Sequence, residues 1–459
     1  MAGMAEKSAA PVFFSPALAM GVRPVVKLNE ENAEFHVGIS GRGGAAMADV
    51  KRILSFIDGM ADWSEPCAAG VQRPAFTPAY RRGADWAIRA FQEAGLETRE
   101  DGAGNIFGLL PGSRVHDKWI MAGSHLDSVK CAGKYDGISG VACALEAARM
   151  IRESGEPLAL DFAVVGMMEE EGTTTGHCCL GSAFMVGKLG EADLDEIREA
   201  EGDRTLRQLL SDYGTDGPLH SLADTDVRAF LELHGEQGPV LDREKVGVGV
   251  VTAITGQSWY AVTVEGASNH AGTTPMSLRH DAMAAAARII SRMEAFEREK
   301  FGDDATFTTG AIQLSPGSPN VIPGKAWFTV DIRSVDEGIL RAMNEELQRV
   351  LDQERQEGFS ITVSVNAEKQ PTALDAGLQD LIAASCEKLG QPFKRMPSGA
   401  VHDSMNLADS FPTAMIFVPN RDGISHNPAE YIAPEDLRRG ADVLYETIRA
   451  VDQRESEKI

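Results

Sequence analysis

Histidine and acidic residues cluster in the stretch GSHLDSVKCAGKYDG, residues 123–137 of this chain. His125 stands two residues before Asp127, and Asp136 stands just before a glycine. The apolar run KWIMA precedes the stretch, and ISGVACALEAARMI, with the composition of a helix, follows it. Between a strand and a helix, these residues fit either a polar loop with an aspartate at the helix N-cap or half of a metal site.

Three further groups of acids and histidines stand where apolar runs end. They are in MMEEEG, LELHGEQGP and GISHNPAE, and their polar residues are Glu169, Glu170, Glu171, His234, Glu236, Gln237 and His426. Imidazoles and carboxylates together bind divalent cations, and one carboxylate can bridge two ions. A second carboxylate beside the ions could serve as general base, and the adjacent pair Glu170–Glu171 fits this division of roles. Each group alone is more typical of an ordinary loop or turn, so the metal hypothesis depends on all four together.

The elements that must position these residues alternate between strands and helices. Short strands are predicted at GNIFGLLPG and KWIMAGSHLDS, a helix at GISGVACALEAARMIRES, and a buried strand at LALDFAVVGMMEEEG. This order predicts an α/β layer with a mostly parallel sheet. Ligands of such sheets bind at the carboxyl ends of the strands, which is where the polar groups stand.

The pattern changes near residue 252, and a chain of 459 residues is long enough for two domains. From GQSWYAVTVEG to SITVSVNAE, alternating strands and two long helices follow the order β-α-β-β-α-β, which is typical of a ferredoxin-like domain. The α/β pattern then returns, ending in a helix from Pro434. We therefore predict an N-terminal arm (1–48), a metal-binding α/β domain (49–251 and 367–459) and an inserted ferredoxin-like α+β domain (252–366).

Charge, hydropathy and cysteine content restrict the class of protein. The chain has 68 acidic and 44 basic residues and a formal charge of −24, which argues against a nucleic-acid partner. No run is long and apolar enough to span a bilayer, and PVFFSPALAMGV lacks the features of a signal peptide. Six cysteines in a chain of this length do not form a disulfide framework. We expect a cytoplasmic protein without a membrane or nucleic-acid partner.

An ordered set of motifs, from about residue 70 to the C-terminus, resembles the hydantoinase/carbamoylase branch of the M20 metal-dependent amidohydrolases. The motifs are GSHLDS with KYDGISGV, EEEG with LGS, HGEQGPVLD, GASNHAGTTPM, SPNVIPGKAWFTVDIR, SGAVHDSMNLA and GISHNPAEY. That branch includes N-carbamoyl-L-amino-acid hydrolases, β-ureidopropionases and allantoate or ureidoglycolate amidohydrolases. The resemblance implies a catalytic metal domain that binds two divalent ions per subunit, with zinc expected and manganese, cobalt or nickel as alternatives.

The same resemblance implies roles for individual residues. The expected metal ligands are His125, Asp136 as the bridge, Glu171, His234 and His426. Glu170 is expected to act as general base, and Asp127 to orient His125. The expected substrate-binding residues are Gln237, His270, Asn320, Arg333 and His402. A guanidinium such as Arg333 suits a substrate carboxylate, and His270 and Asn320 could stabilise an oxyanion.

The expected reaction is hydrolysis of an N-carbamoyl-L-amino acid to the amino acid, carbon dioxide and ammonia. Alternatives are an allantoate or ureidoglycolate substrate, an aminoacylase, dipeptidase or deaminase of the same family, and a metal-bound binding protein without turnover. Two segments depart from the family pattern, VKCAGK with Lys130 and Cys131, and TTTGHCC at 173–179, which puts the substrate in doubt. The inserted domain is expected to form a homodimer and to close as a lid, with hinges near Val251–Gly256 and Glu368–Thr372.

Overall fold

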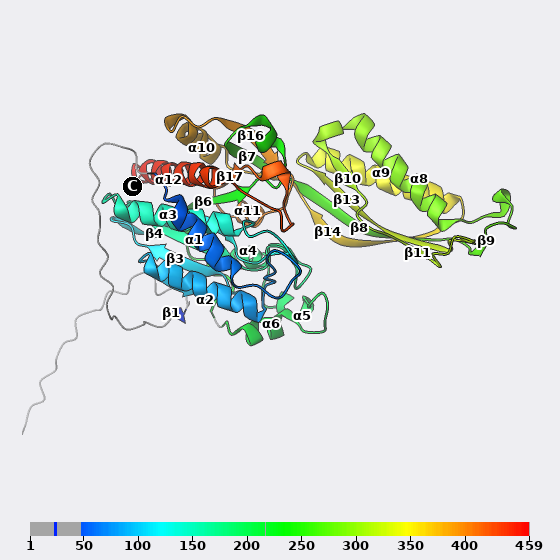
Figure 1. The fold of residues 1–459 in the computed structure, drawn as a ribbon, viewed down its shortest axis with the longest axis horizontal. Helices are drawn as coiled ribbons and strands as arrows, with labels where there is room; N and C mark the ends of the chain where they lie inside the picture. The colour runs from blue at the N-terminus through cyan, green and yellow to red at the C-terminus, as the bar shows by residue number, and fades with distance from the viewer. Residues whose placement is uncertain (1–22, 25–46, 216, 459) are drawn as a thin grey trace, which may run out of the picture. The chain divides into compact units, whose positions relative to one another are not determined.

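The computed structural model describes residues 23–24, 47–215 and 217–458 (Figure 1). The predicted arm, residues 1–48, lies almost wholly outside the described residues. The described chain divides into two compact units. Unit 1 takes the described parts of Met1–Val250, Asp375–Lys394 and Asn406–Ile459, and unit 2 takes Val251–Leu374 and Arg395–Met405. The predicted division placed 395–405 in the α/β domain, whereas these residues group with unit 2.

Unit 1 is an α/β structure, as predicted. Its elements in chain order are β1 (Arg23–Pro24), α1 (Val50–Ala61), α2 (Pro78–Glu93), β2 (Glu97–Glu100), β3 (Ile106–Leu110), β4 (Val115–His125), α3 (Ile138–Glu153), β5 (Leu160–Met167), α4 (Leu180–Met185), α5 (Asp193–Glu196), α6 (Leu206–Tyr213), β6 (Asp226–Gly235), α7 (Val240–Glu244), α10 (Ala376–Lys388), β17 (Thr413–Val418), η4 (Arg421–Gly423) and α12 (Pro434–Ser456). Three elements cross the unit boundaries, namely β7 (Val248–Ile254), β16 (Phe393–Ser398) and α11 (Ser404–Leu407). The patterns used above do not predict α4, α5 and α6, because helices of 4 to 8 residues are too short to show a periodicity.

The main sheet has the strand order β1-β2-β3-β5-β4-β6-β17-β7-β15, where β15 is Thr372–Ala373, and β16 also pairs with β7. The central neighbours β5, β4, β6 and β17 pair in parallel, as predicted. By contrast, β1, β2 and β3 pair antiparallel with their neighbours. Because the four central strands run the same way, their carboxyl ends meet at one edge of the sheet, and loops leaving that edge can share a site.

Helices cover one face of this sheet, and α3 is central among them (Figure 1). It packs on β4, β5 and β6, and α1 and α12 pack on it in turn. Thirteen of its 16 residues are buried, which explains why its sequence is rich in small apolar residues. On the other face, Phe107, Trp119 and Phe230 of the sheet share a core with Met185 of α4. The sheet is therefore buried on both faces, as its continuous apolar strands indicate.

Unit 2 contains a second, antiparallel sheet. The elements of unit 2 in chain order are β8 (Gly256–Glu265), β9 (Asn269–His270), η2 (Met276–Leu278), α8 (Ala282–Lys300), η3 (Gly302–Asp304), β10 (Thr306–Thr308), β11 (Ile312–Ser315), β12 (Val321–Ile322), β13 (Lys325–Ser334), α9 (Glu337–Gln356), β14 (Ser360–Lys369) and β15 (Thr372–Ala373). The antiparallel sheet is made of β8, β10, β11, β13 and β14. The strand order is β10-β13-β8-β14, with β11 also on β13. Both long helices pack against the same buried strand residues, such as Val262 and Val330. The long elements follow the predicted β-α-β-β-α-β order, but the single strand predicted at TFTTGAIQLSP is divided into β10 and β11, and the short strands β9 and β12 were not predicted.

In the described part of the chain, no helix is long and apolar enough to cross a membrane.

A buried arginine connects the end of α1 to the exit of β4. The Arg73 guanidinium donates from Nε to the carbonyl of Leu126 (2.8 Å) and from Nη1 to those of Met60 (2.9 Å) and Trp63 (3.3 Å). Burial lowers its pKa to about 10. Because Leu126 follows His125 directly, this contact fixes the backbone beside the first candidate ligand.

We predict that Arg73→Met destabilises unit 1. The change leaves three carbonyls without their charged donor, so the free energy of unfolding should fall by about 3 kcal/mol. Urea unfolding followed by circular dichroism measures this loss. Arg198→Met, at an exposed arginine of the same unit, should change the midpoint little. Equal midpoints for the two variants would contradict the role given to Arg73.

Candidate metal centre

Asp136 lies at the centre of a cluster built from three loops of unit 1 and the ends of β4 and β6. Its Oδ1 is 3.2 Å from His234 Nε2 and 3.8 Å from His125 Nε2. Its Oδ2 is 3.1 Å from His426 Nε2. His125 is the last residue of β4, His234 is near the end of β6, and His426 follows β17. The predicted gathering of strand ends therefore brings the three histidines around one buried carboxylate.

Two sets of possible ligand atoms share this carboxylate. In each set the atoms lie within 4.8 Å of one another; one is His125, Asp136 and His234, and the other is Asp136, Glu171 and His426. A third set of the same kind joins His125 to Glu170 and Glu171. A carboxylate that belongs to two ligand sets is what a bridging ligand requires.

Backbone carbonyls fix the orientation of two imidazoles. Nδ1 of His125 is 3.2 Å from the carbonyl of Asp127, and Nδ1 of His234 is 3.0 Å from that of Gly235. A ring nitrogen that faces a carbonyl must carry the proton, which leaves Nε2 with a lone pair for a metal. Both Nε2 atoms face Asp136.

The carboxylate of Asp127 organises the acidic turn after β5. Its Oδ1 accepts from the amide of Glu170 and its Oδ2 from the amide of Glu171, each at 3.1 Å. Glu169 has a φ of 55°, and this left-handed residue turns the chain so that both following glutamates reach the cluster. Glu170 Oε2 is 3.8 Å from His125 Nε2, and Glu171 Oε2 is 3.4 Å from His426 Nε2. Asp127 thus holds this turn, and its Oδ1 also lies 3.5 Å from His125 Nδ1.

Unusual backbone conformations concentrate around the cluster. Gln237 and His426 have positive φ angles of 57° and 53°, as Glu169 does. Non-glycine residues adopt this region at a cost, and such residues collect at functional sites. Gly137, next to Asp136, also has a positive φ of 65°, and a Cβ there would lie 2.5 Å from His125 Nε2. Only glycine lets the imidazole approach this closely.

Charges in the cluster perturb one another strongly. Burial would raise the pKa of Asp136, yet the imidazoles of His125, His234 and His426 hold it well below its usual range. Hydrogen bonding to Asp136 raises the pKa of His426 to about 9. Burial, with Asp136 nearby, raises the pKa of Glu171 to about 7. The carboxylates therefore favour positive charge among them, and protons and metal ions compete for the same atoms.

The residues present fit divalent cations. Glu171 Oε1 is buried, and among the described residues no hydrogen-bond donor reaches it. A buried carboxylate oxygen without a donor is costly unless a cation binds it. Asp127, Asp136 and Glu170 are buried, and the side chain of Glu171 is only 6% exposed; these four carboxylates surround three imidazoles that can be neutral. This donor set suits a metal such as zinc.

Gln237, which was predicted to bind substrate, lies in this cluster. Its Nε2 is 3.2 Å from Asp136 Oδ2 and 3.3 Å from Ser425 Oγ. The side-chain amide of Gln237 therefore donates a hydrogen bond to the Asp136 carboxylate.

Two acids contribute in ways that the sequence analysis did not foresee. Glu430 Oε2 accepts from the amides of Tyr135 and Asp136, both at 3.3 Å. Glu169 Oε1 accepts from the amides of Thr174 (2.8 Å) and Thr175 (2.7 Å). Glu430 stands four residues after His426, a spacing that could have drawn attention to it. The unusual TTTGHCC segment thus has a structural task, because its threonines hold Glu169.

The other predicted substrate residues belong to unit 2. His270 and Asn320 are exposed near the β9–β12 pair, where the amide of Ala271 donates to the carbonyl of Asn320 (2.9 Å). Arg333 is near the end of β13, and its Nη1 donates to the carbonyl of Gly399 (3.1 Å). His402 is buried, with Nε2 3.0 Å from Ser398 Oγ. None of the four is among the residues that surround Asp136.

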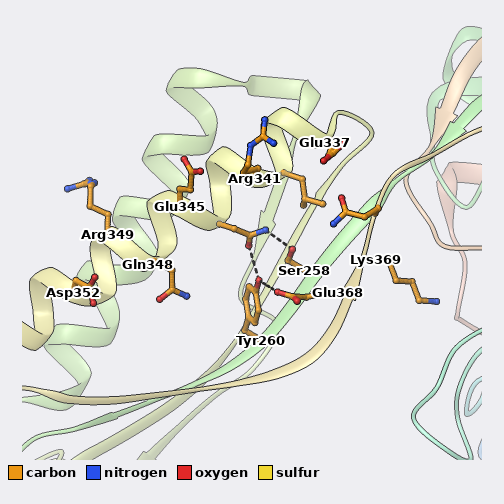
Figure 2. A pocket seen from close by; sticks show the side chains of 13 residues that line it. Ser258, Tyr260, Glu337, Arg341, Glu345, Gln348, Arg349, Asp352, Glu368 and Lys369 are labelled. Atoms are coloured by element: carbon orange, nitrogen blue, oxygen red, sulfur yellow. Dashed lines mark hydrogen bonds between the residues drawn. The ribbon is translucent and has the colours of Figure 1, made fainter. Parts of the chain in front are cut away.

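A hollow of about 750 Å³ in unit 2 lies between α9 and the strands β8 and β14 (Figure 2). Inside it, the Tyr260 hydroxyl is 2.7 Å from Glu368 and 3.1 Å from Asn344. Its walls carry side chains of both charges, and the predicted site residues are not among the residues that line it. This hollow is therefore separate from the candidate centre.

Comparison with known proteins agrees with this geometry. Residues 121–450 match the model of peptidase family M20/M25/M40. The N-carbamoyl-L-amino-acid amidohydrolase of Paenarthrobacter aurescens is 36% identical over 388 residues, which cover 84% of this chain and 94% of that protein. The allantoate amidohydrolase of Bacillus subtilis (strain 168) is 34% identical over 400 residues, covering 86% and 96%.

The fold agrees with a solved structure as well. The crystal structure of an amidase of the hydantoinase/carbamoylase family from Burkholderia multivorans matches with a TM-score of 0.81 and 32% identity, covering 88% of this chain and 98% of that one. With these relatives and a family match over more than half of its length, the chain belongs to the metal-dependent peptidase family M20/M25/M40.

Proposed function

We propose that this protein is a dinuclear metal-dependent amidohydrolase that cleaves the carbamoyl C–N bonds of N-carbamoyl-L-amino acids. The observation that carries the proposal is the carboxylate of Asp136, shared by two sets of ligand atoms with Glu170 beside them. The similarity to N-carbamoyl-L-amino-acid amidohydrolases supports the substrate class. The similarity to allantoate amidohydrolases makes allantoate the second candidate, since it too carries a ureido group.

Five residues would hold two divalent ions. His125 and His234 would supply ligands to one ion and Glu171 and His426 to the other, while Asp136 belongs to both sets of ligand atoms. The charge balance supports two ions, because four carboxylates and three neutral imidazoles match two divalent cations. Zinc suits this mixture of nitrogen and oxygen donors, and manganese, cobalt and nickel are the alternatives. Bound ions would act as Lewis acids and lower the pKa of water.

Glu170 performs the proton transfers. Its carboxylate accepts a proton as water attacks the carbamoyl carbon, and it then delivers that proton to the leaving nitrogen. Cleavage of an N-carbamoyl amino acid with one water yields the amino acid, carbon dioxide and ammonia. Asp127 keeps Glu170 in position through the amide contact at 3.1 Å and orients His125. A protein that only bound metal would need no such base.

Arg333 binds the carboxylate of the substrate. Its Nε and Nη2 both donate to Asp331, each at 2.9 Å. The guanidinium is thus held with one edge occupied, and its Nη1–Nη2 end is the part that can meet a second carboxylate. His402 and Gln237 complete the recognition of the substrate in this proposal.

His270 and Asn320 stabilise the developing oxyanion, and they come from a second copy of the chain. Arg333 and Lys325 mark the two ends of β13, about 26 Å apart for eight extended residues. Lys325 pairs with Glu265 at the end of β8, and His270 follows beyond that end. A small amino-acid derivative cannot touch both Arg333 and His270 of one chain. Two copies can supply them to the same site.

Strand β11 offers the surface for this homodimer. All four of its residues are exposed, and β13 is its partner on one side only. Ile312 is 44% exposed and Leu314 38%, and in η2 of the same unit Met276 is 78% exposed and Leu278 73%. An edge strand with apolar side chains is a liability in a monomer, and pairing with a second copy covers it. In this proposal the inserted unit forms the dimer and acts as the lid. A cytoplasmic location stays a prediction from the sequence.

A screen for ammonia release tests the substrate class. We expect turnover of N-carbamoyl-L-amino acids in the presence of zinc or manganese, and little turnover of N-acetyl amino acids or dipeptides. Allantoate and ureidoglycolate belong in the same screen. Faster turnover of allantoate would favour the second candidate, and turnover of dipeptides alone would contradict both.

The two adjacent glutamates should respond differently to substitution. Glu170→Gln should keep about two metal ions per chain and lose roughly a hundredfold or more of kcat, the scale of a missing general base. Glu171→Gln should lower the metal content towards one ion. Metal analysis and kinetics on the same samples separate the roles. The assignment is reversed if Glu170→Gln loses metal and Glu171→Gln does not.

Complementation tests whether His270 serves the other subunit. His270→Ala should bind metal normally and turn over slowly. Mixed with Glu170→Gln, it should regain activity, because each mixed dimer has one site with both Glu170 and His270. Ammonia release after subunit exchange measures the recovery.

The matched control removes the dimer surface. The double variant Ile312→Asp, Leu314→Asp should be monomeric by light scattering. In this background, mixing the His270 and Glu170 variants should no longer restore ammonia release. Absence of recovery between exchanging, intact dimers would place His270 in the site of its own chain.

A further inference from the structure

Two cysteines, Cys67 and Cys131, lie on neighbouring segments, and Cys131 belongs to the loop that joins His125 to Asp136. Residues 67–73 run along this loop and are hydrogen-bonded to it at two points. Val71 and Ala132 exchange two backbone hydrogen bonds of 2.9 and 2.8 Å, and the amide of Ser128 donates to the carbonyl of Arg73 (3.1 Å). Cys131 is directly before Ala132, and Cys67 is four residues before Val71. The metal-centre role proposed above leaves both cysteines unused.

The Cys131 thiol faces the same segment, since its Sγ lies 4.0 Å from Gln72 Oε1, and the thiols of Cys67 and Cys131 are near enough for each to shift the pKa of the other. Cys67 Sγ also lies 3.2 Å from the carbonyl of Ala69 and 3.4 Å from that of Gly70. Gly70 is so close to the loop that a Cβ on it would lie 2.1 Å from the Ala132 carbonyl oxygen. Both cysteines are partly exposed, so a small reagent can reach them. Two cysteines on backbone segments that are hydrogen-bonded to each other can close to a disulfide when their side chains turn toward one another.

The surroundings make Cys131 the better nucleophile of the pair. Hydrogen bonding from the backbone at Ala68 lowers the pKa of Cys131, while burial and the neighbouring thiol raise that of Cys67. The thiolate is the reactive form of cysteine. Of the other cysteines, Cys143, Cys179 and Cys386 are buried, and Cys178 is exposed with its sulfur 3.7 Å from the carbonyl of Glu171.

We propose that Cys67 and Cys131 form a modification site that reacts with small disulfides and closes to an intramolecular disulfide. The Cys131 thiolate attacks one sulfur of a reagent RSSR, the S–S bond breaks, and one RSH leaves after taking a proton. The Cys67 thiolate then attacks the Cys131 sulfur of the mixed disulfide, and a second RSH leaves. The two cysteines are oxidised, and RSSR is reduced to two RSH.

Closure would tie segment 67–73 more firmly to the ligand loop. Because this loop carries Asp136 and follows His125, its opening is a step by which the centre can lose metal. This second part rests on the proposed metal function, whereas the disulfide chemistry does not depend on it. Oxidation should therefore slow the release of bound zinc to a chelator by several-fold.

Oxidised glutathione is the probe for the chemistry. The full-length protein should lose the mass of two hydrogen atoms, and a digest should contain the Cys67–Cys131 cross-linked peptide. Cys67→Ser should stop at a glutathione adduct on Cys131, and Cys131→Ser should react slowly. Cys178→Ser is the matched control and should close like the unmodified chain. A stable glutathione adduct without closure, or reaction mainly at other cysteines, would overturn the modification site.

Zinc release tests the coupling to the metal centre. Zinc-loaded protein, oxidised or reduced, is mixed with a chromogenic chelator and the release rate is followed. We expect the oxidised form to release zinc several-fold more slowly, and Cys67→Ser to show no change after the same treatment. Equal rates in a fully cross-linked protein would overturn the coupling. A protein that binds no zinc but forms the disulfide would refute the proposed function and leave the modification site standing.

Discussion

The burial of one carboxylate, that of Asp136, constrains the rest of unit 1. A buried carboxylate is unfavourable unless positive or donating groups surround it on all sides. Here His125, His234 and His426 approach to between 3.1 and 3.8 Å, and they come from three different strand ends. Only a sheet whose central strands run in parallel and end at the same edge can supply them together. The parallel order β5-β4-β6-β17 is therefore a condition for the centre.

The loops at that edge are held by residues whose own side chains do not contact the Asp136 carboxylate. Asp127 fixes the turn of Glu170 and Glu171 through two amides, and Arg73 fixes the backbone just after His125. Such support holds charged side chains in place although they repel one another. The left-handed residues Glu169 and His426 carry conformational strain, and the hydrogen bonds from the amides of Thr174 and Thr175 to the Glu169 carboxylate hold that residue in place.

The clustering of the candidate ligands could be predicted from the sequence because each of them is a histidine or an acid that stands at the end of an apolar strand or in the loop that follows it. His125 and His234 end apolar strands, and Glu170 and Glu171 follow one. The role of Glu430 could not be foreseen, since a carboxylate that accepts backbone amides has no motif of its own. The grouping of His402 with unit 2 depends on the path of the chain. The pairing of the segment that contains Cys67 with the loop that contains Cys131 joins distant parts of the sequence, which periodicity cannot detect.

The length of β13 has a meaning for how such a protein can change over evolution. In the proposed dimer, the lengths of β8 and β13 set the distance between two ends of the inserted unit. Arg333, at one end, binds the substrate carboxylate in its own copy, and His270, beyond the other end, serves the site of the second copy. An insertion of one residue in either strand would turn every later side chain to the opposite face. An insertion of two would restore the faces and lengthen the reach by about 7 Å. The number of residues in these strands should thus be preserved more strictly than their sequence.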